Sequence, residues 1–328
     1  MYLLLEKINQ KLRGEYFLID YIDKIGNFST HALDSIFNLE GYYDMYNHDA
    51  NFLKSHPKLI SGRVSFGTVK DGKRTYEFVF VPNNGFLNSS CPLLNDSELK
   101  LSFDRCKMKT AFMEIAEPNT KLTNEVIEIK NVFAVTEYIS TEKLRQYFGR
   151  IETKPIAYNY DECDITLKTL PMNETSIRID NVRGGNNPFL LFIGIIKSNG
   201  LNGDLSLSST CFERANVKQI TITLNGKTVN GYPLENINGS SVMACQKFYD
   251  VTNRYMNILS SDGLKQSHFL SNWVYGHKFE AETTSQGWLG VHLELEKAYD
   301  QSYSMVIWSF QNCAITVDKF HSIEKIIL

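Results

Sequence analysis

The segment that most constrains the fold is Lys218 to Asn230, KQITITLNGKTVN. Three apolar residues, Ile220, Ile222 and Leu224, alternate with threonines, so one face of an extended strand is apolar. Asn225-Gly226 follows immediately and suits a type I′ turn, in which both central residues have positive φ. The segment therefore predicts a β-hairpin. A hairpin buries little surface alone, so it needs a sheet and a second sheet to pack against.

Similar strand patterns recur along the chain of 328 residues, which is long enough for two domains. Composition indicates a globular protein, with 43% hydrophobic and 22% charged residues, and the 20 Phe and 17 Tyr favour strands. The first sixty residues or so favour short helices and loops, including a helical stretch from Leu3 to Leu12. Strands are expected beside a turn at Asp71-Gly72 and at Leu99 to Phe103. A short helix after Ser140 marks the predicted domain boundary.

In the second half, strands follow one another, and Phe189 to Ile196 is apolar enough for a strand buried on both faces. Turn residues from Arg183 to Pro188 predict a break, and Met243 to Met256 predicts an excursion that contains a helix. The other predicted strands are Asp164 to Leu170, Ser176 to Val182, Tyr275 to Glu280, Trp288 to Leu295, Tyr303 to Phe310 and Asn312 to Val317.

Charge and cysteine content exclude several classes of protein. The formal net charge is −3 and no basic run occurs, so a nucleic-acid footprint is absent. The N-terminal apolar run is too short for a signal peptide, and no run is long enough for a membrane helix. We therefore expect an intracellular protein that is not secreted, with reduced thiols at its six cysteines, Cys91, Cys106, Cys163, Cys211, Cys245 and Cys313.

Motifs for catalysis or cofactor binding are weak throughout. Gly226-Lys227-Thr228 imitates the end of a P-loop, but Thr221 stands where the first glycine is needed. No G-x-S-x-G elbow occurs, and the seven histidines lack metal-ligand spacing, His48 and His56 being the best pair. Two acidic groups, Asp161-Glu162-Asp164 and Glu280 with Glu282, are better interpreted as solvated strand positions. We expect no enzyme and no cofactor.

Several stretches resemble the double jelly-roll major capsid proteins of Polinton (Maverick) elements and adintoviruses, of the adenovirus-like lineage. The similar stretches are the tyrosine-rich Tyr16 to Tyr43 ending in GYY, Leu99 to Phe112, Val132 to Phe148, Phe189 to Asn202, Leu224 to Leu234 and Phe279 to Ile307. The resemblance spans most of the chain but contains no catalytic motif. Family members have further strands before the tyrosine-rich stretch, so the resemblance implies a first roll without its N-terminal strands, either because the reading frame is truncated or mis-annotated or because those strands are encoded separately.

The resemblance implies an all-β fold of two antiparallel jelly-roll β-sandwiches in tandem with short helical excursions. The first roll would cover residues 1–140 and the second residues 141–328. The resemblance also implies that three chains form a homotrimeric, pseudo-hexameric capsomer of an icosahedral shell in a virion. Each capsomer would contact neighbouring capsomers, penton proteins and minor capsid proteins. Neither sequence-specific nucleic acid nor a membrane span is implied.

Two residue-level hypotheses follow. Phe248, Tyr249, Tyr255 and Trp273 would be aromatic contacts between subunits, supplied by the excursion from Met243 to Ser271 and its flank. A β-sandwich module that binds carbohydrate or protein is the alternative function, with Trp288, Tyr303 and Trp308 as stacking residues. A cupin-type enzyme is a third class, but it would need histidines clustered with a carboxylate on adjacent strands.

Overall fold

The computed structural model describes residues 154–328, with gaps at 203, 205–206, 208, 230–233, 236–241, 253–272, 280–285, 319–322 and 328. Before residue 154 it describes 8–12, 18–19, 21–22, 67–70, 73–76, 86, 99–103 and 133. The first half contributes β1 (Ile8–Leu12), β2 (Gly67–Lys70), β3 (Lys73–Tyr76) and β4 (Leu99–Phe103). The second half contains β5 (Ile156–Leu170), β6 (Ser176–Asn186), β7 (Leu190–Lys197), α6 (Ser198–Asn202), β8 (Val217–Leu224), β9 (Lys227–Thr228), β10 (Leu234–Glu235), α7 (Val242–Val251), β11 (Val274–Lys278), β12 (Gln286–Leu295), β13 (Tyr303–Val317) and β14 (Ile323–Ile327).

Eight strands of the second half form a jelly roll. One sheet has the order β5-β13-β7-β11 and the other β6-β12-β8-β10, with β14 and β9 added to them. Four of the pairings join the first strand to the last, the second to the seventh, the third to the sixth and the fourth to the fifth, all antiparallel. This is the pattern of one long antiparallel ribbon that rolls up into two sheets. The all-β class and the jelly roll are thus confirmed.

The Lys218–Asn230 hairpin has the expected geometry. Strand β8 buries Ile220, Ile222 and Leu224, and the intervening threonines are half-buried. Asn225 and Gly226 have φ of 51° and 78°, as a type I′ turn requires. Local alternation and turn chemistry were sufficient here because both act within a few residues.

Three strand boundaries were predicted wrongly in the second half. Strand β6 continues through Gly184 and Gly185 to Asn186, because each of these residues pairs with β12. Strand β5 begins at Ile156, so Asp161, Glu162 and Asp164 lie in its middle and not at its start. Residues Asn312 to Val317 continue β13, because one unbroken register with β5 extends over all fifteen residues of each strand. Long-range pairing overrides local turn preference in each case.

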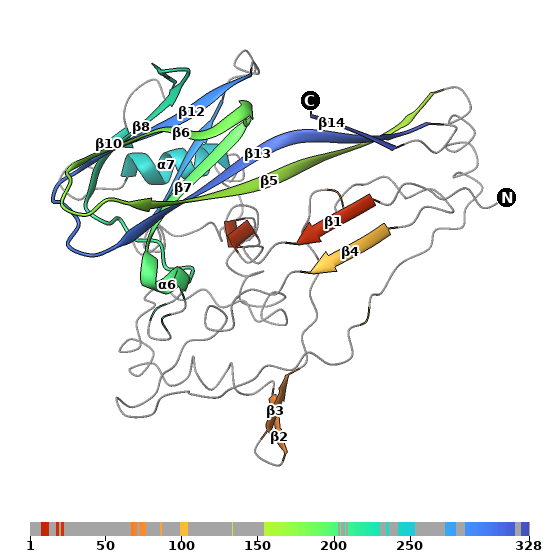
Figure 1. Cartoon of the computed structure of the whole chain (residues 1–328), viewed down its shortest axis with the longest axis horizontal. Helices are drawn as coiled ribbons and strands as arrows, with labels where there is room; N and C mark the ends of the chain where they lie inside the picture. Colours follow the sequence, from red (N-terminus) through yellow and green to blue (C-terminus); the bar gives the residue numbers. More distant parts are fainter. Residues whose placement is uncertain are drawn as a thin grey trace.

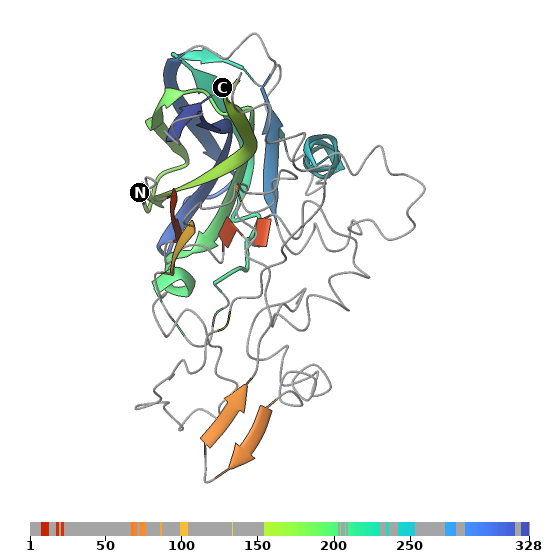
Figure 2. The ribbon, with the colours of Figure 1, turned by 90° about the vertical axis from the view of Figure 1, so that its right-hand side faces the viewer.

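The first half is described only in short pieces. Residues Ile8–Leu12 form a strand, not the predicted helix, because they pair in parallel with β4. Strands β2 and β3, expected on either side of Asp71-Gly72, pair as an antiparallel hairpin, which lies away from the roll in both views (Figures 1 and 2). Leu99–Phe103 is a strand, as expected. The predicted boundary at residues 140/141 and the short helix after Ser140 lie outside the described residues.

Candidate functional site

Both faces of the sheet β5-β13-β7-β11 are covered in its central strands. Seven consecutive residues of β13, Tyr303–Ser309, are buried, and so are the six residues Leu191–Ile196 of β7. Because successive strand residues point to opposite faces, both faces must be covered. The prediction of a strand buried on both faces is therefore confirmed for β7. A sandwich of two sheets covers only one face of each, so this sheet has a second cover.

Residues from the first half of the chain belong to this core. Leu18, Tyr21 and Ile22 are 0–5% exposed and lie in the same apolar cluster as the two sheets. The indole Nε1 of Trp308 on β13 donates a hydrogen bond to the backbone oxygen of Leu18 at 2.9 Å. Phe212 packs against both Tyr21 and Trp308, with ring centroids 5.5 and 5.1 Å apart. The second roll thus binds a segment of the tyrosine-rich stretch.

Helix α7 lies against β11 (Figure 2) and carries Phe248, one of the residues proposed as subunit contacts. Phe248 is 1% exposed and packs on Phe192 of β7, with ring centroids 5.8 Å apart. Val251 of the same helix lies over Gly276, where an added Cβ would come within 3.2 Å of it. Phe248 is therefore a core residue within the chain, and its burial leaves little of its side chain for the contact with another subunit that the sequence predicted.

Trp273, another proposed subunit contact, is also buried within the chain. It is 3% exposed, packs on Tyr275 at 5.7 Å, and has the Arg214 guanidinium 5.9 Å from its ring centroid. Its backbone N–H donates to the oxygen of Phe212 at 3.1 Å. Tyr255 and the side chain of Tyr249 lie outside the described residues, so their role as subunit contacts stays a proposal.

His277 on β11 is expected to make the stability of the chain sensitive to acid. Burial, and secondarily the charge of Lys247 on α7, lowers the pKa of His277 from 6.5 to about 4. Because the unfolded chain takes up this proton at a higher pH, we expect stability to fall as pH drops from about 6.5 to 4, by up to roughly 3 kcal/mol. Denaturant melts across this window measure the loss. The variant H277Q should flatten the profile, and an equal loss in both proteins would contradict the assignment.

Strands β5 and β13 run together past the end of the roll and form an arm with β14 (Figure 1). One face of the arm has its own apolar cluster, formed by Phe86, Ile156, Tyr158, Tyr160, Cys313, Ile315 and Val317. Phe86 packs edge-on against Tyr158 and Tyr160, with centroids 6.0 and 5.8 Å apart. The arm is therefore a second small core, separate from the core of the roll.

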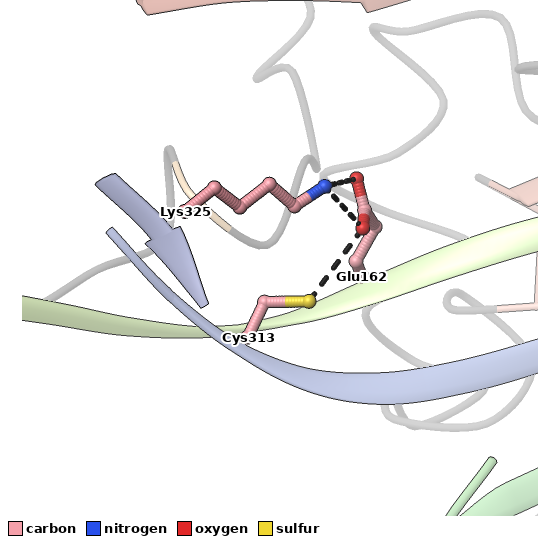
Figure 3. A network of polar contacts seen from close by, with 3 residues as sticks. All are labelled: Glu162, Cys313 and Lys325. Carbon is pink, nitrogen blue, oxygen red and sulfur yellow. Dashed lines mark hydrogen bonds and ion pairs between the residues drawn. The ribbon is translucent and has the colours of Figure 1, made fainter. Parts of the chain in front are cut away.

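An ion pair joins the two outer strands of the arm. Lys325 Nζ of β14 lies 2.7 and 2.6 Å from the two carboxylate oxygens of Glu162 on β5, above Cys313 of β13 (Figure 3). The Cys313 thiol donates to Glu162 at 3.5 Å. Burial lowers the pKa of Lys325, but its hydrogen bond and charge interaction with Glu162 outweigh this effect, and the net shift is upward. Glu162 therefore links β5 to β14 through its ion pair with Lys325.

We expect Cys313 to resist alkylation. Burial, reinforced by the Glu162 carboxylate, raises the pKa of the thiol to about 11, so almost no thiolate exists at neutral pH. Mass spectrometry after iodoacetamide treatment at pH 7.5 should find Cys313 unmodified in the folded chain and modified in denaturant. The half-buried Cys163 and Cys211 serve as internal controls. Rapid modification of Cys313 in the folded chain would contradict this geometry.

The structure does not bring together the residues proposed for sugar stacking or for metal binding. Of the three aromatics proposed for sugar stacking, Trp308 and Tyr303 are buried at 0% and 7%, whereas Trp288 is 37% exposed. His277 lies on β11 and His292 on β12, which belong to different sheets. His48, His56, Glu280 and Glu282 fall outside the described residues. Within the described part of the chain, no group of three His, Cys, Asp or Glu could hold a metal, and no helix could cross a membrane.

No protein-family model matches the sequence. Among curated proteins, no match was found. The solved structures that align with it include a chain in the 3.5 Å cryo-EM structure of the Sputnik virophage, with 14% identity over 53% of this chain and 39% of that chain, at a TM-score of 0.35. A chain of the PBCV-1 virus capsid aligns with 10% identity over 56% of this chain and 54% of that chain, at a TM-score of 0.36. The mavirus major capsid protein aligns with 7% identity over 58% of this chain and 44% of that chain, at a TM-score of 0.34. The chain thus spans between 39% and 54% of these proteins. The fold assignment rests on the strand order.

Two features of the site had no local signal. Glu162 and Lys325 are separated by 163 positions, and only the shared register of β5, β13 and β14 brings them together. Leu18 and Trp308 are 290 positions apart. The apolar spacing of the tyrosine-rich stretch could have indicated a buried face, but not which surface it covers.

Proposed function

We propose that this protein is a structural capsid protein of a virion and that its function lies in assembly rather than in catalysis. Jelly rolls occur in capsids, lectins and cupins, so the roll alone does not select among them. The observation that carries the proposal is the double cover of the sheet β5-β13-β7-β11. A free-standing lectin roll leaves one face of each sheet to solvent, whereas here residues of the first half join the core.

In this proposal, residues 1–140 and 141–328 form two rolls side by side, joined by contacts between the first half of the chain and the core of the second roll. The contacts of Leu18 and Tyr21 with the second roll are the kind that would hold the first roll against it. Three chains with two similar rolls each give a nearly sixfold capsomer from a threefold trimer. In this proposal the neighbours of each trimer are further capsomers, penton proteins and minor capsid proteins, as the resemblance to Polinton and adintovirus capsid proteins implies.

The alternatives have less support from the described side chains. A cupin would need histidines and a carboxylate on adjacent strands, and His277 and His292 lie on different sheets. A lectin that uses all three proposed aromatics would need them on one surface. Tyr303 instead packs at 4.5 Å on the buried ring of Tyr299, and Trp308 is in the core.

The test is the native mass of the full chain, measured by size exclusion with light scattering. We expect a discrete species of three times 37.6 kDa, and particles by electron microscopy at high concentration. A chain that stays monomeric at every concentration would contradict the proposal. Tyr249→Ala and Tyr255→Ala then test the remaining candidate contacts, since loss of the trimer without loss of stability would assign these side chains to the interface.

A further inference from the structure

Trp288 is a partly exposed aromatic side chain near one end of the roll that the proposed function does not use. It lies near the start of β12 and is 37% exposed, in contrast to the buried Trp273 and Trp308. Its backbone N–H donates to Asn225 Oδ1 at 2.9 Å, and its oxygen accepts from the Asn225 N–H at 2.9 Å. The type I′ turn of the β8–β9 hairpin thus fixes the backbone that carries the indole.

Two glycines, Gly226 and Gly184, lie beside this indole. Gly226 of the turn lies against one part of the ring, since an added Cβ would be 3.5 Å from it. Gly184 of β6 is the direct cross-strand partner of Trp288, so a side chain there would lie beside the indole on the same face. Among the described residues, an added Cβ at Gly184 would meet Asn181 Oδ1 alone, at 3.9 Å. On the face that carries the indole, the described residues therefore leave space at Gly184, beside Trp288.

We propose that Trp288 is the stacking platform of a carbohydrate site, which takes the apolar face of a hexopyranose ring in a glycan. A sugar ring is polar at its rim and apolar on its faces, so it needs one flat aromatic surface and nearby amides. The exposed Asn181 and the half-buried Asn186 supply side-chain amides on β6, near Gly184. A protein partner would call for a larger apolar patch, and among the residues described on β6, β8 and β12, Trp288 is the exposed large apolar side chain.

This inference is independent of the assembly proposal, because it rests on Trp288 and its neighbours within one chain. Fluorescently labelled full-length chain would be applied to an array of immobilised glycans that end in glucose, galactose, mannose or N-acetylhexosamine. We expect binding to a subset, with Trp288→Ala weakening it about tenfold or more and Trp288→Phe less. Leu167→Ala, which truncates an exposed apolar residue of the other sheet, is the matched control and should bind normally.

A second variant separates loss of binding from loss of folding. Gly184→Val keeps Trp288 and suits an extended strand, yet it fills the space beside the indole. We expect it to abolish glycan binding while the melting temperature stays within a few degrees of wild type. The proposal is overturned if the wild-type chain binds no glycan of the array, or if Trp288→Ala and Gly184→Val bind as well as wild type.

Discussion

Replacing Trp308 by alanine is expected to lower the free energy of unfolding by about 3–5 kcal/mol, the range for removal of a fully buried large aromatic. Trp308 is 0% exposed, contacts Phe212 and donates its indole N–H to Leu18. The variant removes packing between the sheet and the first-half segment and leaves the Leu18 oxygen without this donor. Urea denaturation of the full chain, followed by circular dichroism, measures the change.

The same substitution at Trp288 is the control. Because that side chain is partly exposed and its backbone holds the hydrogen bonds to Asn225, Trp288→Ala should cost less than about 1 kcal/mol. Similar losses for the two variants would contradict the burial of Trp308. Trp308→Phe should recover part of the lost stability, since it restores ring volume but not the donor.

Phe248→Ala should destabilise the chain by about 3–5 kcal/mol through the loss of α7 docking. Phe248 is 1% exposed and packs on Phe192, so its removal leaves a cavity between the helix and the sheet. Hydrogen exchange should show faster exchange in α7 and β11 than in the arm formed by β5, β13 and β14. This outcome would distinguish a core residue from a subunit contact.

Tyr249→Ala is the neighbouring control for that assignment. As a proposed subunit contact, Tyr249 should affect native mass more than stability. If Phe248→Ala left the unfolding free energy unchanged and only dissociated oligomers, the original prediction of an interface residue would be right and the burial argument wrong.

Strand positions were predictable wherever a local rule sufficed. The β8–β9 hairpin, the β2–β3 hairpin and the buried strand β7 follow from alternation, from Asn-Gly and Asp-Gly turns and from an unbroken apolar run. Predictions failed where pairing extends a strand past local turn residues, as at Gly184-Gly185 in β6, or turns a short helix-like pattern into a strand, as at Ile8–Leu12. In those places hydrogen bonds to a distant strand outweigh propensities of about 1 kcal/mol or less per residue.

For the candidate sites, residue type alone was a poor guide to exposure. Phe248, Trp273 and Trp288 are all aromatic residues of the second half, yet two are buried and one is exposed. Nothing in the sequence near them separates these cases. What decides is whether another element covers the ring, as Phe192 of β7 covers Phe248 and Arg214 covers Trp273.

The amino-acid sequence by itself determined that the second half is a set of antiparallel strands with specific turns, since side-chain alternation and positive-φ dipeptides act over a few residues. Only the tertiary structure decided which strands pair, that Leu18 enters the core beside Trp308, that Lys325 meets Glu162, and that Trp288 stays open to solvent. These contacts join residues far apart in the chain, and the burial and hydrogen bonding that select them arise only when the ribbon has rolled into two sheets.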